Sequence, residues 1–178
     1  MISLIDKGMD VPSFRPPGAD DGPRVHELIR HCPPLDVNSR YCTLLQCSHF
    51  TATSAVAEDR DRLIGWVGGY RVPAAPEVLF VWQIAVHPRA RGRGLAVRLI
   101  EDVLRRPASR DVRVVEATVT EANVASTRMF ASLAEALGAP LKTTPHFDAV
   151  RHLGGTQDTE HLLRIGPFAP RYAGAAEV

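Results

Sequence analysis

Apolar and polar positions along the chain follow two periods, one typical of strands and one of helices. Short apolar or alternating runs predict β-strands at residues 13–15, 53–58, 63–70, 80–86, 112–119, 145–152 and 158–166. Apolar residues at helical spacing predict α-helices at residues 23–31, 39–47, 95–104 and 123–137. This order, βααββ(βα)(βα)ββ, predicts an α/β fold with a mixed, mostly antiparallel sheet of about six to seven strands and helices on both faces.

Turn and capping residues mark where these elements end. The polar turn at residues 59–61 joins two predicted strands into an antiparallel hairpin. Asn38 or Ser39 is expected to cap the second helix, and Gly138 to end the last one. Residues 71–76 carry prolines and are predicted to form a loop.

The segment after strand 80–86 carries the clearest functional signal. Pro88 stops the strand because proline has no N–H for sheet pairing, a basic turn with Gly92 and Gly94 follows, and a helix begins near Leu95. A strand, a glycine turn and a helix bring free backbone N–H groups and the positive end of the helix dipole to one point. Glycine also lets the backbone approach an anion with no Cβ in the way. We therefore predict a phosphate-binding site.

The spacing within this turn narrows the class of phosphate ligand. A P-loop would need a Gly-Lys-Ser/Thr ending, and a dinucleotide fold would need a third glycine where Val97 stands. The pattern Arg89-x-x-Gly92-x-Gly94, followed by Ala96, resembles the pyrophosphate loop of the Gcn5-related N-acetyltransferases, the GNAT family. This resemblance implies that acetyl-CoA binds at Ile84, Ala85, Val86, Arg89, Arg91, Gly92, Arg93, Gly94, Leu95, Ala96, Asn123 and Ser126.

A second pattern of the same family follows strand 112–119. Asn123, Ser126 and Phe130 resemble the pattern Asn-x-x-Ala/Ser-x-x-x-Tyr. In that family the asparagine reaches the pantetheine of CoA, and the tyrosine usually protonates the departing thiolate. Phe130 has no proton to give. Either another group acts as the acid, or the CoA thiol, with a pKa of about 8.5, leaves as the thiolate.

Several longer segments resemble one group within that family, the L-2,4-diaminobutyrate acetyltransferases. These segments are residues 32–41, 69–73, 79–86, 116–120 and 164–168. The resemblance implies direct acetyl transfer to the γ-amine of L-2,4-diaminobutyrate in a ternary complex, as a step of ectoine biosynthesis, by a homodimer. Two alternatives stay open: an acetyltransferase for another small diamine or amino acid, and a non-catalytic sensor that binds acyl-CoA.

Transfer to an amine requires a base, because an alkylammonium with a pKa near the lysine value of about 10.4 is protonated at neutral pH. Asp36 and Glu116 are predicted to be catalytic, and Glu160 is a third candidate base. As structural alternatives, Glu116 is a strand-edge residue facing water and Asp36 caps a helix. Contact with the substrate is predicted for Asp36, Asn38, Tyr41, Trp82, Gln83 and Glu160.

Composition restricts the class of protein further. A chain of 178 residues with 45% hydrophobic content predicts one globular domain over residues 13–168, with flexible ends at 1–12 and 169–178. No apolar stretch is long enough for a membrane span, and a net charge of +1 argues against a nucleic-acid surface. Three cysteines without metal-ligand spacing indicate a reduced, cytoplasmic setting and no metal.

Overall fold

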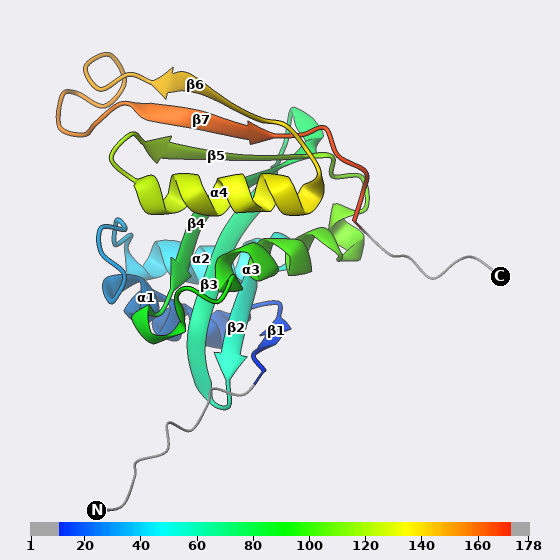
Figure 1. The fold of residues 1–178 in the computed structure, drawn as a ribbon. Coiled ribbons are helices and arrows are strands. Elements are labelled where there is room, and N and C mark those ends of the chain that lie inside the picture. Colours follow the sequence, from blue (N-terminus) through cyan, green and yellow to red (C-terminus); the bar gives the residue numbers. More distant parts are fainter. Residues whose placement is uncertain (1–10, 172–178) are drawn as a thin grey trace, which may run out of the picture.

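A computed structural model describes residues 11–171, and residues 1–10 and 172–178 lie outside its description (Figure 1). The helices are α1 Gly22–Arg30, α2 Arg40–His49, α3 Leu95–Leu104 and α4 Val124–Leu137. The strands are β1 Ser13–Arg15, β2 Ala55–Asp59, β3 Arg62–Val72, β4 Ala75–Val86, β5 Val114–Thr120, β6 Leu141–Phe147 and β7 Glu160–Ile165. Most of the ends predicted to be flexible fall outside the described residues.

The strands form one sheet in the order β1-β2-β3-β4-β5-β7-β6. β4 and β5 pair in parallel and every other pair of neighbours is antiparallel, so the predicted mixed, mostly antiparallel sheet is confirmed. The chain leaves β4 through α3 before it enters β5, because a parallel pair needs a long crossover connection.

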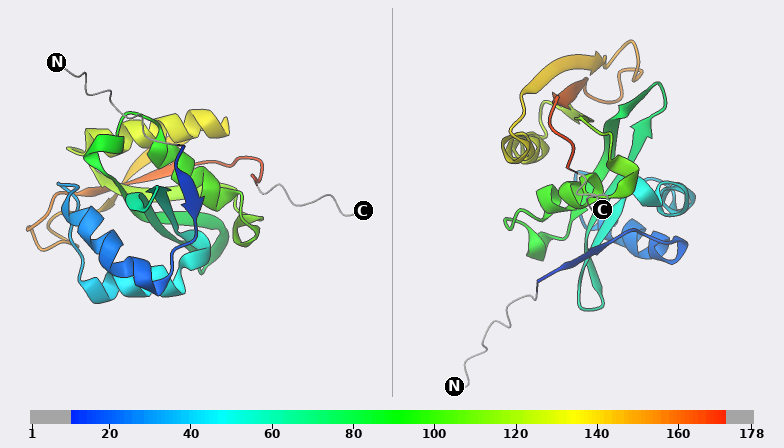
Figure 2. Two further views of the ribbon diagram at one scale, coloured as in Figure 1. Left: turned by 90° about the horizontal axis from the view of Figure 1, so that it is seen from below. Right: turned by 90° about the vertical axis from the view of Figure 1, so that its right-hand side faces the viewer.

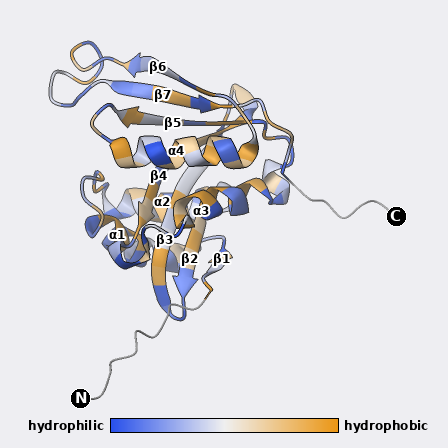
Figure 3. Cartoon of the chain, viewed as in Figure 1, coloured by the Kyte–Doolittle hydropathy of each residue, from blue (hydrophilic) through white to orange (hydrophobic). Residues whose placement is uncertain are grey.

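Helices cover both faces of the sheet, as predicted (Figure 2). The larger core lies between the sheet and helices α3 and α4, where Leu99, Ile100 and Leu133 are fully buried. The smaller core lies beneath α1 and α2 and centres on Val25 and Trp66, both with no exposed surface. The helices expose polar residues on their outer faces, so hydrophobic and hydrophilic positions alternate along α3 and α4 (Figure 3).

Local chemistry begins and ends the helices where the sequence predicts. The hydroxyl of Ser39 accepts a hydrogen bond from the Cys42 N–H at 3.1 Å, so Ser39 rather than Asn38 caps α2. The side chain of Asn123 accepts from the Ser126 N–H at 3.1 Å and caps α4. Gly138 ends that helix in the left-handed region, at φ 61°.

Two predicted boundaries are wrong. The loop predicted at 71–76 is shorter in the structure, a turn at residues 73–74, because β3 runs to Val72 and β4 begins at Ala75, opposite it. Pro76 is tolerated near the start of a strand, where its missing N–H costs no interior ladder bond. The strand predicted at 145–152 is shifted to Leu141–Phe147. Beyond it the Asp148 carboxylate accepts from two following backbone N–H groups, which makes a turn that competes with the sheet ladder.

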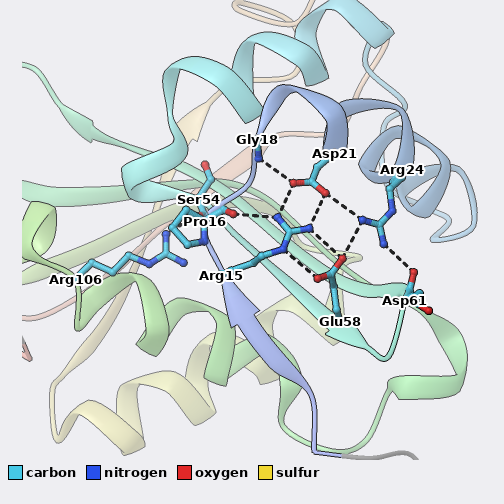
Figure 4. Close-up of polar contacts among 9 residues, drawn as sticks. All are labelled: Arg15, Pro16, Gly18, Asp21, Arg24, Ser54, Glu58, Asp61 and Arg106. Atoms are coloured by element: carbon cyan, nitrogen blue, oxygen red, sulfur yellow. Dashed lines mark hydrogen bonds and ion pairs between the residues drawn. The ribbon is translucent and has the colours of Figure 1, made fainter.

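A charged cluster joins β1 to the start of α1 and to β2 (Figure 4). The Arg15 guanidinium donates to Asp21 at 2.7 and 2.8 Å and to Glu58 at 3.0 Å. Arg24 pairs with the same two carboxylates, at 3.2 and 2.9 Å. Hydrogen bonds from Arg15 hold the pKa of Asp21 and of Glu58 below the usual range, although burial opposes this. The four charges therefore connect three elements that lie apart in the sequence.

Candidate active site

Strands β4 and β5 separate soon after they meet (Figure 1). Among the described residues, β4 pairs with β5 at residues 78–80 alone, and from Val81 to Val86 it has no strand partner on that side. The two strands therefore open like a V, and the unpaired backbone groups of β4 face the opening. Such groups can pair with an extended ligand or polarise a carbonyl oxygen.

A cavity of about 440 Å³ lies beside this opening. It is lined by the glycine turn, the start of α3, the end of β4, the first half of α4 and residues 32–35. Gly92 and Gly94 have φ values of 76° and 67°, a region that glycine adopts without strain. A Cβ at either position would meet no atom within 4 Å, so the space over the turn is open to a ligand. The turn and the helix that follows it suit a pyrophosphate.

Most residues predicted to bind the cofactor line this cavity. They are Ile84, Val86, Arg91, Gly92, Gly94, Leu95, Ala96, Asn123 and Ser126. The side chains of the other three do not line the cavity. Ala85 is buried in the core beneath α1 and α2, and Arg89 and Arg93 line a separate groove. Sequence reasoning missed Cys32, Arg128 and Ser132, which also line the cavity. The last two belong to the α4 face that starts at Ala125, so helical spacing is the signal that could have found them.

A second group of side chains lies where β4 passes the segment that links α1 to α2. Gln83 is 9% exposed, and its Nε2 donates to the backbone oxygen of Asp36 at 2.8 Å. Burial raises the pKa of Glu160 above its ordinary value, and the negative charge of Asp36 raises it further. Thr118 acts against this shift by hydrogen bonding. The structure thus brings together Asp36, Gln83 and Glu160, three residues from distant parts of the chain.

Two oxygen atoms in this group lack a hydrogen-bond donor. Among residues 11–171, no donor reaches Gln83 Oε1 or Glu160 Oε2, and both atoms are buried. Buried acceptors in folded proteins are nearly always paired, so an unpaired one requires an explanation. Two such oxygens and the Asp36 carboxylate form an environment that favours a ligand rich in N–H donors, such as an ammonium group.

The other predicted substrate residues surround this group less closely. Trp82 is 46% exposed and makes an edge-to-face contact with Tyr70, at 6.4 Å between ring centroids. Tyr41 is 69% exposed, in the first turn of α2. Within the described part of the chain, no hydrogen bond joins Asn38 or Tyr41 to Asp36, Gln83 or Glu160.

The side chain of Glu116 already has a charged partner. Its carboxylate forms an ion pair with Arg164, its neighbour across the β5–β7 pair, and its side chain is 14% exposed. The interpretation of Glu116 as a strand-edge residue facing water is therefore wrong, because β5 lies between β4 and β7 in the sheet. Its predicted role as a base stays a prediction.

Phe130 is 3% exposed and belongs to the larger core. It does not line the cavity, and its phenyl ring carries no acidic proton. No cluster of three or more metal-ligating side chains occurs within residues 11–171. Over the same range, no helix has both the length and the apolar character that a membrane crossing requires.

Comparison with known proteins shows the family to which the chain belongs. The model of the acetyltransferase (GNAT) family matches residues 23–134, and the chain belongs to this family. The predicted family and fold are thus confirmed.

Closer relatives define the group within it. L-2,4-diaminobutyric acid acetyltransferase of Methylotuvimicrobium alcaliphilum is 47% identical over 85% of this chain and 88% of its own length. The enzyme of the same name from Chromohalobacter salexigens is 48% identical over 89% and 82%. The chain is thus one of the L-2,4-diaminobutyric acid acetyltransferase family.

A solved structure from that family has the same fold. It is the diaminobutyrate acetyltransferase of Paenibacillus lautus in complex with L-2,4-diaminobutyric acid and coenzyme A. Its TM-score is 0.84 at 36% identity, and the alignment covers 95% of this chain and 100% of that one.

Proposed function

We propose that this protein transfers the acetyl group of acetyl-CoA to the γ-amine of L-2,4-diaminobutyrate. The observation that carries the proposal is the group of acceptors at Asp36, Gln83 and Glu160, beside an opening that suits an acyl-CoA. A diamino acid brings two ammonium groups, and this group of oxygens lacks donors. The relatives named for diaminobutyrate support the same substrate.

In the reaction, the neutral γ-amine attacks the thioester carbonyl. A C–N bond forms, the C–S bond breaks, one proton leaves the nitrogen, and the products are Nγ-acetyl-diaminobutyrate and CoA. The family resemblance makes this product an intermediate of ectoine biosynthesis. Backbone groups of β4 that lack a β5 partner polarise the carbonyl, and the glycine turn holds the pyrophosphate.

The two carboxylates of the group have different tasks in this proposal. The exposed Asp36 binds the α-ammonium, which does not react, and so fixes which end of the substrate points to the thioester. Glu160 accepts the proton of the γ-amine, because its raised pKa makes it a better base than an ordinary glutamate. Glu116 remains the alternative base. With Phe130 buried in the core, we propose that CoA leaves as the thiolate.

We further propose the homodimer that the family resemblance implies. The expected cytoplasmic location and the expected absence of nucleic-acid and membrane partners remain predictions.

A substrate panel tests the activity. Thiol release from acetyl-CoA is followed with L-2,4-diaminobutyrate, ornithine, lysine and 2,3-diaminopropionate, and NMR locates the acetyl group in each product. We expect fast release with diaminobutyrate and acetylation at its γ-nitrogen. Preference for another diamine would reassign the substrate. Acetyl-CoA binding without thiol release from any amine would overturn the catalytic function and favour the sensor.

A further inference from the structure

The side chain of Gln83 owes its direction to an irregularity in β4. Gly68 and Gly69 of β3 lie opposite Gln83 and Val81, so Trp82 is an extra residue in β4. Such a β-bulge interrupts the alternation of side chains between the two faces of a sheet.

Neighbouring contacts show on which face Gln83 lies. Trp82 contacts Tyr70, which also contacts Phe50 at the end of α2. Ala85, three positions after Trp82, packs in the core beneath α1 and α2. Strict alternation would place positions 82 and 85 on opposite faces. The bulge therefore places consecutive residues, Trp82 and Gln83, on the face covered by α1 and α2.

On that face, Gln83 holds the segment that carries Asp36. Residues 33–38 run between α1 and α2 and belong to neither helix. Within the described chain, the bond from Gln83 Nε2 to the Asp36 oxygen is the only hydrogen bond that joins these residues to the sheet, and it spans 47 positions. It is also nearly withdrawn from water, since Gln83 is 9% exposed. The amide thus ties Asp36 to β4, together with the packing of Leu35 against the smaller core and the bond from the Cys32 thiol to the Val86 oxygen at 3.3 Å.

The carbonyl oxygen of the same side-chain amide makes no hydrogen bond within the described residues. Gln83 Oε1 is buried and has no donor among residues 11–171. Burying an acceptor without a partner is unfavourable, and an apolar side chain of the same shape would avoid that cost. An amide at this place is explained if its N–H holds the Asp36 segment and its oxygen accepts a bond from the ligand.

We propose that Gln83 is the positioning residue of the amine site. Its N–H sets the distance of Asp36 from β4, and its Oε1 shares the α-ammonium with the Asp36 carboxylate. In the proposed function the thioester lies along β4, so this distance decides which diamine chain length brings the second amine to the carbonyl. Gln83 thereby contributes selectivity against ornithine, which is one methylene longer. The inference rests on the proposed function.

The test compares Gln83→Met with a matched control, Gln46→Met. Methionine keeps the approximate shape of glutamine and removes both hydrogen bonds. Gln46 is also buried, at 3% exposure, but its amide bonds to Cys42 within α2. For Gln83→Met we expect the KM for diaminobutyrate to rise about tenfold or more, with the KM for acetyl-CoA changed by less than about twofold. We also expect the preference for diaminobutyrate over ornithine to fall. The control is expected to change neither.

A third variant and a second measurement distinguish a failure of the positioning role from a failure of the proposed function. Gln83→Glu keeps the acceptor and loses the donor, so its KM for diaminobutyrate is expected to rise as well. An unchanged KM in either Gln83 variant of an active enzyme would overturn the inference. Hydrogen exchange of the amides at 35–38 in the free protein reports the positioning without any reaction. We expect faster exchange in Gln83→Met than in Gln46→Met, and equal exchange would refute the positioning role. If the unaltered enzyme does not acetylate diaminobutyrate, the proposed function fails, and the exchange result still stands.

Discussion

At the scale of single residues, the surroundings of a carboxylate determine which interactions it makes. Asp36 is exposed on the segment between two helices, Glu116 is paired with Arg164, and Glu160 is partly buried with a raised pKa. All three were candidates for the base from sequence alone. The arginine beside Glu116 stabilises its charge, whereas burial destabilises the charge of Glu160. The same side-chain chemistry thus yields an ion pair at Glu116 and a carboxyl group with a raised pKa at Glu160.

We expect Glu160→Gln to lower kcat by about 10²- to 10³-fold, because a general base typically contributes that much. Burial raises the pKa of Glu160, so the basic form exists only above that raised pKa, and activity falls as the pH drops through it. This low-pH limb of the kcat profile is expected to disappear in the variant. Steady-state rates across the pH range measure both effects.

Glu116→Gln is the comparison. It removes a partly exposed ion pair, so we expect nearly unchanged kcat and a loss of at most about 1 kcal/mol in the free energy of unfolding. A large fall in kcat for Glu116→Gln with normal activity for Glu160→Gln would exchange the two roles.

At the scale of elements, the charged cluster of Arg15, Asp21, Arg24 and Glu58 joins the first strand to the rest of the fold (Figure 4). Both carboxylates are more buried than the arginines, with side-chain exposures of 7% and 15% against 38% and 39%. Removing an arginine would leave a poorly solvated negative charge, whereas the exposed sides of the arginines are screened by water.

We expect Arg15→Gln to lower the free energy of unfolding by about 1–3 kcal/mol at pH 7, less than for a fully buried pair because Arg15 is partly exposed. The depressed pKa values of Asp21 and Glu58 stabilise the fold above the unfolded values of about 3.9 and 4.3. This contribution is lost as the pH falls through the folded values. The unaltered protein and Arg15→Gln therefore differ less in their free energy of unfolding, measured with urea, as the pH approaches 3. A difference that is constant with pH would contradict the electrostatic origin.

At the scale of the whole molecule, the far end of the sheet is the least covered part. β6 is the outermost strand, exposed along almost its whole length, and it carries Lys142 and Pro145, residues that discourage pairing between strand edges. Phe147 at its end is 42% exposed and Val150 just beyond is 78% exposed. This apolar surface, Phe147 with Val150, is the one we assign to the proposed contact between two copies.

Light scattering after gel filtration tests the dimer. We expect a mass of twice the 19.5 kDa of the chain. Phe147→Asp places a charge in the contact and should shift the mass towards that of one chain. Val124→Asp, at another exposed apolar residue, is the control and should leave the mass unchanged. A single-chain mass for the unaltered protein would refute the homodimer, and a dimer that survives Phe147→Asp would place the contact elsewhere.

The sequence alone determined the features that depend on near neighbours in the chain. Within the described residues, helical and strand periods predicted the four α-helices and the approximate places of the seven strands, and Ser39, Asn123 and Gly138 marked helix ends. The glycine turn predicted the family and its acetyl-CoA. These predictions succeed because caps, turns and hydrophobic periods involve residues only a few positions apart. Two boundaries failed where a strand pairing or a turn outweighed the local pattern.

Only the tertiary structure decided how the amine site is assembled. The pairing of β5 with β7 brings Arg164 to Glu116, and the two side chains form an ion pair. The bulge in β4 turns Gln83 towards the Asp36 segment, and burial raises the pKa of Glu160. Each of these effects depends on strand register and on burial between distant segments. A one-residue shift in the register of a strand would turn every side chain of that strand to the opposite face of the sheet. No pattern along the chain encodes that register directly, so it becomes visible only in the folded molecule.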